Sequence, residues 1–446
     1  MTVNPTLNIN RLSEKGEGIA EFSGREIYVK GAVPGDVVTL NVGEPFARGS
    51  KRCPGKIISF AEKSPLRGSF LCPHSQDCGS CTLGLLSAKA QMDIKRQDIS
   101  EALASIGAQY QSEIEIFSLE ELPCRFKSIR YFAEVDGKVV NGYYESRSHK
   151  VVPVANCILE PSWFSVFAKE LCLLADRYAL NSYNGKSGTL RSLMLRDSGS
   201  GDSSEKLALL GVASRPVDDF LEALKKLALS YGIKALFLDE NVSCGNKVVA
   251  GNLLSLGTDS TIQVELGALR YQVSAQSFMQ VNYSVAQALY KEAVDWCKGS
   301  RGRQALDICC GVGTMTLMLS RYFNRVTGIE IVEQAVAAAR ENAAQNGIKN
   351  CEFVAGDMSE CIGRYLYDEV DAVIADPSRA GLGPKVCRAL SRLKGEVRLC
   401  CIFCSLIGLK RDIPMLLEGG YRIHKVKGFD MFKNSRHIET MVLLSK

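Results

Sequence analysis

The stretch Ala305–Thr314 (ALDICCGVGT) has the pattern of a ligand-binding turn. A short apolar run leads into Gly311-Val312-Gly313, and an apolar, helix-like segment follows. Strand, glycine turn and helix together seat a nucleotide-like ligand at the carboxyl edge of a parallel sheet. Glycine is needed in the turn because a Cβ would obstruct close approach of the ligand to the backbone.

Acidic residues fall at or beside the ends of predicted strands in the same part of the chain: Glu330, Asp357, Asp376 and Glu439. Glu330 lies seventeen residues after Gly313, where a carboxylate can accept hydrogen bonds from ribose hydroxyls. The turn lacks the third glycine of dinucleotide-binding enzymes, and no second nucleotide-binding half is apparent. The pattern therefore favours S-adenosylmethionine, a single nucleoside without phosphate. Each acid taken alone is also compatible with a helix cap or a solvated position.

Cys404 ends an apolar run and is predicted to reach the same edge of the sheet. A thiolate at that place can act as a nucleophile, whereas a buried structural cysteine is the alternative. For Cys400 and Cys401, in the middle of the run, we expect the buried structural role.

A second group of cysteines, Cys72, Cys78 and Cys81, lies in a loop rich in Gly, Pro, Ser and Asp. Tetrahedral zinc and an iron–sulfur cluster both need four ligands. The predicted fourth ligand is Cys157, and Cys124 is its competitor. Three cysteines without any ligand role remain the alternative.

From about residue 276, helices and strands alternate, as in a doubly wound α/β sheet. This alternation would bring the glycine turn, the acids and Cys404 to one edge. The predicted strands are residues 305–308, 326–330, 352–354, 370–375 and 397–404, the helices are 281–298 and 332–345, and the final hairpin is 421–426 with 437–444.

The rest of the chain predicts two further regions. Short strands between glycine turns over residues 3–60, including 27–29 and 37–40, indicate a small β-barrel, either an oligonucleotide-binding barrel or one with a merely solvated face. A mixed α+β region follows, with a helix over 83–106 and strands over 128–152. Basic and aromatic side chains alternate in those strands and suit RNA, although a half-exposed sheet edge has the same composition. The basic positions are Arg125, Lys127, Arg130, Arg147, His149 and Lys150.

Composition limits the class of protein. Apolar residues make up 46% of the 446 residues and charged residues 23%, with a formal net charge of +5. No apolar run approaches the roughly 20 residues that span a membrane, and the first residues lack a secretory pattern. We therefore expect a cytoplasmic protein without a membrane partner. Seventeen cysteines in such a protein argue for thiols or a metal site rather than disulfides.

Over nearly its whole length the chain resembles the RNA 5-methyluridine methyltransferases, in particular the bacterial enzymes that act on 23S ribosomal RNA. Five motifs carry the resemblance: the four cysteines with Cys157 in Val-Ala-Asn-Cys, Gly142-Tyr-Tyr-x3-Ser148-His149, Phe278-Met-Gln280-Val-Asn282, Asp376-Pro-Ser-Arg379-Ala-Gly, and His437-Ile-Glu439-Thr-Met-Val-Leu.

The resemblance implies a TRAM barrel over residues 1–62, an α+β domain with a [4Fe–4S] cluster over 63–275, and a Rossmann-like methyltransferase domain over 276–446. It also implies that the helix over 83–106 packs on the catalytic domain. Cys72, Cys78, Cys81 and Cys157 would hold the cluster, for which zinc is the alternative.

The resemblance assigns roles to the site residues. Cys404 would be the nucleophile, Glu439 the general base, and Arg379 would contact the substrate. S-adenosylmethionine would lie among Gln280, Cys309, Gly311, Gly313, Thr314, Glu330, Asp357 and Asp376.

In the implied reaction, Cys404 adds to C6 of a uracil, C5 takes the methyl group, and Glu439 removes the C5 proton. The target is then a loop base or a flipped base of structured RNA, and we expect a monomer. Two alternatives are a tRNA uridine-C5 methyltransferase and a non-catalytic RNA-binding or ribosome-assembly factor. A redox-sensing role for the cluster is also open. Three positions depart from the family: Ser405-Leu406 replace Asn-Pro, Cys309 replaces an aromatic residue, and Lys433 replaces a proline.

Overall fold

The computed structural model describes residues 4–446 except 48, 70–71, 76, 111, 147, 244–247, 250–251 and 367–369. These residues form two compact units. The first unit takes the described residues of Met1–Lys95, Gly142–Val154 and Phe432–Arg436. The second takes those of Arg96–Asn141, Ala155–Met431 and His437–Lys446. Within the described part of the chain, no helix is long and apolar enough to cross a membrane.

The first unit contains a six-stranded sheet in the order β1-β5-β6-β4-β3-β2. Its core includes Ile27, Val29, Val38 and Leu40, which alternate along their strands because successive side chains point to opposite faces. The predicted strands at 27–29 and 37–40 are confirmed, whereas the oligonucleotide-binding role stays a prediction. The strands are β1 Thr6–Asn8, β2 Arg11–Leu12, β3 Gly18–Phe22, β4 Arg25–Val29, β5 Val37–Val42 and β6 Arg52–Glu62.

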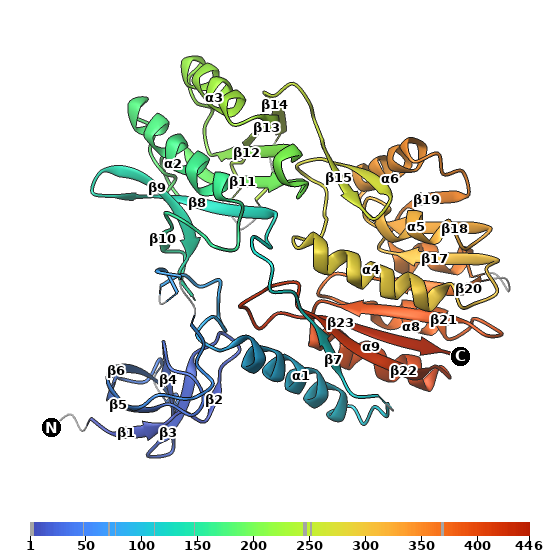
Figure 1. Ribbon diagram of the computed structural model, residues 1–446, viewed down its shortest axis with the longest axis horizontal. Helices are drawn as coiled ribbons and strands as arrows, with labels where there is room; N and C mark the ends of the chain where they lie inside the picture. The colour runs from blue at the N-terminus through green and yellow to red at the C-terminus, as the bar shows by residue number, and fades with distance from the viewer. Residues whose placement is uncertain are drawn as a thin grey trace. The chain divides into compact units, whose positions relative to one another are not determined.

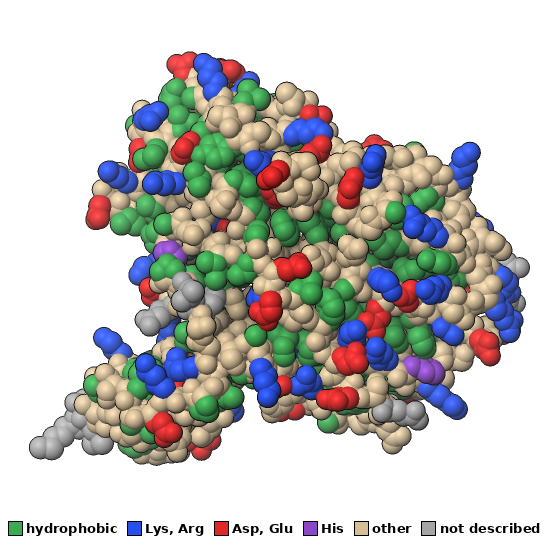
Figure 2. Space-filling view, in the orientation of Figure 1, with side chains coloured by type: hydrophobic (Ala, Val, Ile, Leu, Met, Phe, Trp, Pro, Cys, Tyr) green, Lys and Arg blue, Asp and Glu red, His purple; other side chains and the backbone are tan. Residues whose placement is uncertain are grey.

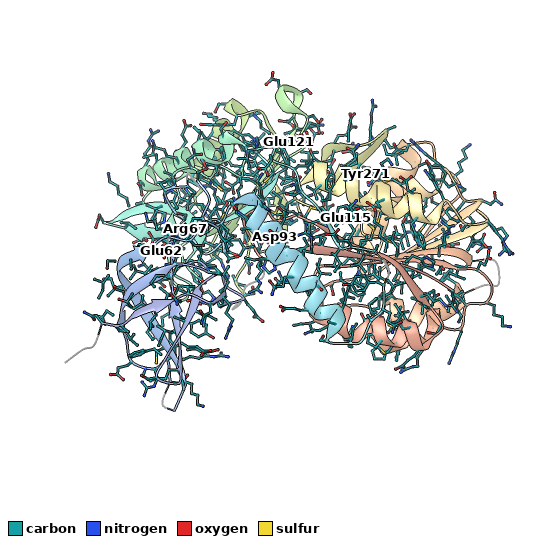
Figure 3. All side chains as sticks on the ribbon, turned by 60° about the horizontal axis from the view of Figure 1, so that its bottom comes forward. Glu62, Arg67, Asp93, Glu115, Glu121 and Tyr271 are labelled. Carbon is teal, nitrogen blue, oxygen red and sulfur yellow. The ribbon has the colours of Figure 1, made fainter. Side chains whose placement is uncertain are left out.

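A buried carboxylate fastens the chain that leaves this sheet. Asp36 accepts hydrogen bonds from the backbone N–H groups of Val33 and Ser64, at 2.7 and 2.9 Å. Its third partner is the guanidinium of Arg67, at 2.6 Å; Figure 3 labels Arg67. The ion pair and these hydrogen bonds hold the pKa of Asp36 below its usual range despite burial. In the same unit, β10 (Val151–Pro153) pairs with Gly142–Tyr144.

The second unit contains a central sheet whose strands follow the order β9-β8-β11-β12-β13-β14. Helices α2 and α3 cover one face of it (Figure 1). On that face Leu193, Leu195 and Leu210 pack against Phe164 and Phe220. The elements are β8 Lys127–Val135, β9 Lys138–Tyr144, α2 Ser162–Arg177, β11 Leu190–Asp197, β12 Lys206–Val212, α3 Asp218–Ser230, β13 Ile233–Glu240 and β14 Asn252–Ser255.

The second unit also holds an eight-stranded sheet in the order β19-β18-β17-β20-β21-β23-β22-β7. The five strands from β19 to β21 are parallel, so the predicted helix–strand alternation is confirmed. The strands are β7 Glu115–Phe117, β17 Gln304–Ile308, β18 Arg325–Glu330, β19 Cys351–Ala355, β20 Val370–Ala375, β21 Arg398–Phe403, β22 Arg422–Phe429 and β23 Glu439–Ser445.

Helices cover both faces of this sheet. Helix α4 contacts β20, β21 and β23 on one face, and α5 and α6 contact the neighbouring strands. Helices α8 and α9 pack against Leu306, Val373 and Leu399 on the other face. The helices are α4 Tyr283–Cys297, α5 Thr314–Leu319, α6 Glu333–Gln345, α7 Met358–Cys361, α8 Gly383–Leu390 and α9 Leu406–Glu418.

A separate hairpin, β15 (Ile262–Leu266) with β16 (Leu269–Val273), packs onto α5 and α6. The hydroxyl of the buried Tyr271 donates to the carbonyl oxygen of Thr314 at 3.1 Å (Figure 3). The backbone N–H of Gln272 donates to the Asn342 side chain at 2.7 Å. The hairpin therefore supports the first turn of α5 from outside the sheet.

Two features differ from the sequence-based expectations. Helix α1 is Ala88–Ala104, shorter than the predicted 83–106, because residues 83–86 form turns and the Ser87 hydroxyl accepts from the Ala90 N–H at the helix start. Strand β7 was not predicted. Its three residues pair with β22, where Gly428 leaves room for the side chain of Ile116.

Candidate active site

The parallel register brings the functional residues to one edge of the eight-stranded sheet. Ile308 pairs with Ile329 and with Ala375, and Ala375 pairs with Cys401. The residues that follow β17, β18, β20 and β21 therefore leave the sheet on the same side. Strand β23 runs antiparallel to β21 and pairs Thr440 with Phe403. This register places Glu439, the first residue of β23, at the edge where Cys404 follows β21.

The glycine turn after β17 has a backbone that requires glycine. Gly311 and Gly313 have φ values of +54° and +85°. A Cβ on Gly313 would lie 3.0 Å from the Phe353 ring and 3.1 Å from Ala339, whereas a Cβ on Gly311 would meet nothing within 4 Å. Gly313 thus serves close packing. The space over Gly311 suits close approach of a ligand to its backbone.

Cys309 has a left-handed backbone conformation, with φ of +66°. Its N–H donates to Ile329 at 2.8 Å, and its sulfur lies 3.6 Å from that of Met358. Met358, which the sequence did not single out, therefore lines the position where the family carries an aromatic residue.

Glu330 and Asp357 lie at the ends of β18 and β19, as predicted. Glu330 accepts from the Gly311 N–H at 3.1 Å and, with its other oxygen, from the Val332 N–H at 3.0 Å. These bonds fix the carboxylate beside the glycine turn. Asp357 is exposed and caps α7 by accepting from the Ser359 N–H at 2.7 Å, which lowers the pKa of Asp357.

Glu439 and Asp376 form a carboxylate pair in a site of low polarity. Glu439 is 2% exposed, and burial raises the pKa of its carboxyl group to about 7. The charge of Arg379 and a hydrogen bond with Gln280 oppose this rise. Burial and the nearby Glu439 raise the pKa of Asp376 well above its usual range. Gln280, whose predicted cofactor contact stays a prediction, hydrogen-bonds to Glu439.

Cys404 is half-buried at the same place, with its sulfur 4.0 Å from the Pro377 carbonyl oxygen. Burial and the charges of Glu439 and Asp376 raise the pKa of its thiol to about 11. Arg379 acts in the opposite direction. Burial therefore disfavours the thiolate form of Cys404, and the charge of Arg379 favours it.

A loop between β20 and α8 presents Arg379. The Asp412 carboxylate accepts from the N–H groups of Leu382 and Gly383, at 2.6 and 3.3 Å. Gly381 has φ of +70°, and a Cβ there would lie 2.3 Å from Asp412. The loop is therefore tightly attached to α9.

The departure from Cys-Asn-Pro at Cys404 preserves a helix cap. The Ser405 side chain accepts from the Ile407 N–H at 3.3 Å and begins α9. Serine is among the best residues for this position. Replacement of Asn-Pro by Ser405-Leu406 therefore keeps the cap that follows Cys404.

The predicted cluster ligands divide between the units. Cys72, Cys78 and Cys81 belong to the first unit, and Cys157 belongs to the second. Among the described residues, no three His, Cys, Asp or Glu side chains come together as ligands of a metal ion. Both the iron–sulfur cluster and the zinc alternative stay predictions.

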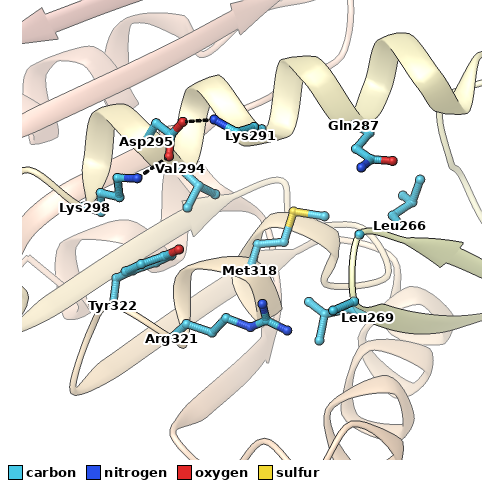
Figure 4. Close-up of a pocket in the computed structure, with 12 residues that line it drawn as sticks. Leu266, Leu269, Gln287, Lys291, Val294, Asp295, Lys298, Met318, Arg321 and Tyr322 are labelled. Atoms are coloured by element: carbon cyan, nitrogen blue, oxygen red, sulfur yellow. Dashed lines mark hydrogen bonds and ion pairs between the residues drawn. The ribbon is translucent and has the colours of Figure 1, made fainter.

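A pocket of about 320 Å³ lies elsewhere in the second unit (Figure 4). Its walls come from the turn of the β15–β16 hairpin, from α4 and from the end of α5. Lys291 and Lys298 both pair with Asp295 at its rim, at 2.5 Å (Figure 4). None of the residues predicted for the active site lines this pocket.

Asn342 supports the glycine turn and was missed in the sequence. Its side chain donates to the Val312 carbonyl at 3.1 Å and accepts from the Gln272 N–H. It is a fully buried asparagine in the last turn of α6. Its place among small apolar residues at helical spacing was the available signal, because a buried amide must find partners.

Comparison with known proteins identifies relatives. Residues 251–446 match the family model described as tRNA (uracil-5-)-methyltransferase. An uncharacterized RNA methyltransferase of Clostridium acetobutylicum is 29% identical over 456 residues, which cover 98% of this chain and 96% of the relative. Another from Caldanaerobacter subterraneus is 28% identical and covers 99% of this chain and 97% of the relative.

A solved structure has the same fold. It is the Pyrococcus abyssi tRNA (uracil-54, C5)-methyltransferase in complex with S-adenosyl-L-homocysteine, with a TM-score of 0.77 and 22% identity. The match covers 99% of this chain and 100% of that chain. The fold is therefore that of a mixed α/β methyltransferase. Together with the match of residues 251–446 to the tRNA (uracil-5-)-methyltransferase model, these findings agree with the resemblance seen in the sequence: the chain is similar over nearly its whole length to proteins named RNA methyltransferases.

Proposed function

We propose that this protein transfers a methyl group from S-adenosylmethionine to C5 of a uridine in structured RNA. The observation that carries the proposal is the pairing of Cys404 with Glu439 at one sheet edge. A thiol for covalent addition lies beside a carboxyl group whose pKa, about 7, suits a base at neutral pH.

The glycine turn is the proposed seat of the methyl donor. Gly311 leaves open space where a ligand can approach the backbone. Glu330, held by the Gly311 N–H, is placed to accept hydrogen bonds from ribose hydroxyls. None of the residues proposed to contact the methyl donor is a lysine or arginine that could bind a phosphate. This fits a nucleoside with a positively charged sulfonium. The remaining proposed contacts are Gln280, Cys309, Gly313, Thr314, Asp357 and Asp376.

Each step of the proposed reaction has a residue to carry it. The Cys404 sulfur gives up its proton to solvent and bonds to uracil C6, which moves the C5–C6 electron pair onto C5 and O4 as an enolate. C5 then bonds to the methyl carbon of S-adenosylmethionine, as the bond between that carbon and the sulfonium sulfur breaks. Glu439 takes the proton from C5, and elimination breaks the C6–S bond and releases Cys404. One proton leaves for each methyl group gained.

Arg379 and Asp376 have supporting roles in this proposal. The guanidinium of Arg379 lowers the pKa of both Cys404 and Glu439, so it lies close enough to act on both. The pKa of Asp376 is raised, so Asp376 can keep its proton and donate a hydrogen bond to a uracil oxygen.

The proposed substrate is 23S ribosomal RNA, reached in the cytoplasm by a monomer. Exposed aromatic and basic residues of β6 and the following segment suit RNA. Phe60 is 36% exposed and carries Lys63 and Arg67 near its ring, at 5.6 and 4.9 Å. Figure 2 shows Lys and Arg side chains on the visible face of the first unit, which contains β6. tRNA is the second candidate, because the matching family model is described by a tRNA enzyme.

Incubation with 5-fluorouridine-containing RNA and S-adenosylmethionine tests the chemistry. Fluorine at C5 cannot be removed by a base as a proton is, so the covalent complex between protein and RNA should accumulate. Denaturing gels detect this complex. Cys404→Ala should abolish it, whereas Cys351→Ala, which alters a half-buried thiol at the opposite end of a strand, should not. Separate 23S rRNA and tRNA transcripts identify the RNA. A protein that binds RNA tightly and forms no adduct with either would be a binding factor instead.

A further inference from the structure

Two cations face each other on neighbouring strands of the central sheet. Lys127 opens β8 and Arg196 lies near the end of β11, and the antiparallel register pairs them directly. Side chains of directly paired residues lie on the same face of a sheet. This face is opposite to the one that holds Leu193 and Leu195 under α2 and α3.

Neither cation has a carboxylate partner among the described residues. Arg196 is 1% exposed, and its Nη2 donates to the carbonyl oxygen of Ser277 at 2.8 Å. Its Nε and Nη1 find no hydrogen-bond acceptor. Lys127 is half-buried, and burial together with the charge of Arg196 lowers its pKa to about 7. A buried guanidinium and an ammonium on directly paired residues lack the anion that such groups require.

The neighbouring buried arginine shows how the fold satisfies such a group for structural purposes. Arg130, three residues further along β8, is also 1% exposed. Its guanidinium donates to Glu160 at 2.6 Å and to Ser165 at 2.8 Å. The acid next to Arg196 does not play this role. Asp197 accepts from Trp163, Gly199 and Ser204 instead.

The cation pair adjoins the segment that leads to the catalytic base. Arg196 holds Ser277, and Gln280, three residues later, hydrogen-bonds to Glu439. The N–H of Phe126, the residue before Lys127, donates to Val281 at 2.8 Å. Between these anchors Phe278 projects into solvent with 66% of its surface exposed.

We propose that Lys127 and Arg196 bind a backbone phosphate of the substrate RNA next to the target nucleotide. The phosphate would lie against half-buried Lys127 and supply the anion that this pair of side chains lacks. Exposed Phe278 would offer its ring to a neighbouring base. This proposal rests on the proposed function, because the RNA that the phosphate site would bind is the substrate of the same active site.

Binding of the 23S rRNA and tRNA transcripts across a range of salt concentrations tests the site. Each phosphate contact contributes about −0.9 to the slope of log K against log salt for duplexes and about −0.7 for single strands. Lys127→Met should weaken binding severalfold to about tenfold at low salt and make the slope shallower by roughly this amount. Lys127→Arg should restore both. Lys226→Met on α3 removes an equal charge from an exposed helix and should change neither.

The outcomes separate the two proposals. Arg196→Gln risks misfolding because Arg196 is buried. The test therefore uses Lys127 variants whose thermal unfolding matches that of the unmodified protein. An unchanged salt slope in folded Lys127→Met would overturn the phosphate site even if the 5-fluorouridine adduct forms. A shallower slope without any adduct in the unmodified protein would keep the phosphate site and reject the methyltransferase chemistry.

Discussion

At Cys404 and Glu439, one environment acts on two groups with opposite consequences. Burial raises the pKa of Glu439 to about 7, which makes it a usable base. The same burial, with two carboxyl groups nearby, raises the pKa of the Cys404 thiol to about 11, which makes it a weak nucleophile until its proton is removed. Arg379 is the group that opposes both shifts.

Glu439→Gln should separate methyl transfer from product release. In the unmodified protein the rate should rise with pH through about 7, because the base acts only when ionised. The variant should turn over about 10²–10⁴-fold more slowly and accumulate methylated RNA bound to Cys404. Rapid-quench assays and denaturing gels measure both effects. Full turnover with no accumulated complex would show that another group removes the C5 proton.

The same residue should make unfolding depend on pH. Folded Glu439 keeps its proton up to about pH 7, whereas in the unfolded chain it loses it near 4.5. The folded state binds more protons between these values, so the free energy of unfolding falls as pH rises through this window. The change that Glu439→Gln makes in the free energy of unfolding should therefore be more favourable above pH 7 than at pH 4.5, by about 1–3 kcal/mol. Chemical denaturation at pH 4.5 and 8 measures it, and equal effects at both would contradict the raised pKa.

Arg379→Met should slow the thiol chemistry. Loss of the guanidinium charge should raise the pKa of Cys404 further and move the acidic limb of the rate profile to higher pH. Alkylation of Cys404 by iodoacetamide, followed by mass spectrometry against pH, reports the thiol directly. Arg388→Met, an exposed position on α8, is the matched control. Identical alkylation profiles would remove Arg379 from this role.

At the scale of elements, the site depends on one antiparallel strand in a parallel sheet. The parallel strands present their carboxyl ends, and β23 presents its amino end at the same edge. Glu439 therefore meets Cys404 although thirty-five residues separate them. The glycine turn completes the edge, with Gly313 used for packing and Gly311 left open.

The two glycines should respond differently to alanine. Each substitution forces an L-residue to a positive φ, at about 1 kcal/mol. Gly313→Ala should lose further stability, because Phe353 and Ala339 must move, whereas Gly311→Ala meets no protein atom. We expect Gly311→Ala to weaken S-adenosylmethionine binding about tenfold or more. Calorimetric titration and thermal unfolding distinguish the effects, and unchanged affinity in Gly311→Ala would place the cofactor elsewhere.

At the scale of the whole molecule, each compact unit is assembled from distant segments. Residues 432–436 of the catalytic third belong to the first unit, and β7, from residues 115–117, completes the catalytic sheet. The predicted boundaries at 62 and 275 assume continuous segments and stay predictions. The assignment of Cys157 and the other three cysteines to different units leaves the cluster to experiment.

Anaerobic purification tests the four-cysteine centre. A thiolate-bound iron–sulfur cluster should give a broad absorbance band at about 400 nm, and Cys78→Ala should remove it. Metal analysis of the same sample gives the zinc content, since zinc alone gives no such band. Cys172→Ala alters a buried cysteine of α2 and should keep the band. Protein with neither metal would reject both forms of the centre.

The sequence by itself predicted the strand–turn–helix unit and the residues at the ends of the parallel strands. It also singled out Cys404 and Glu439 as candidate site residues. Such signals are local, because hydrophobic periodicity and glycine turns depend on neighbouring residues. Only the tertiary structure decided that Gln280 hydrogen-bonds to Glu439, that Asn342 and Met358 contact the glycine turn, and that burial raises the pKa of the Cys404 thiol. It also separated Arg130, paired with Glu160, from Lys127 and Arg196. Burial, pKa and the partner of a charge arise from contacts between strands distant in sequence, and the register that creates those contacts is not written in any one segment.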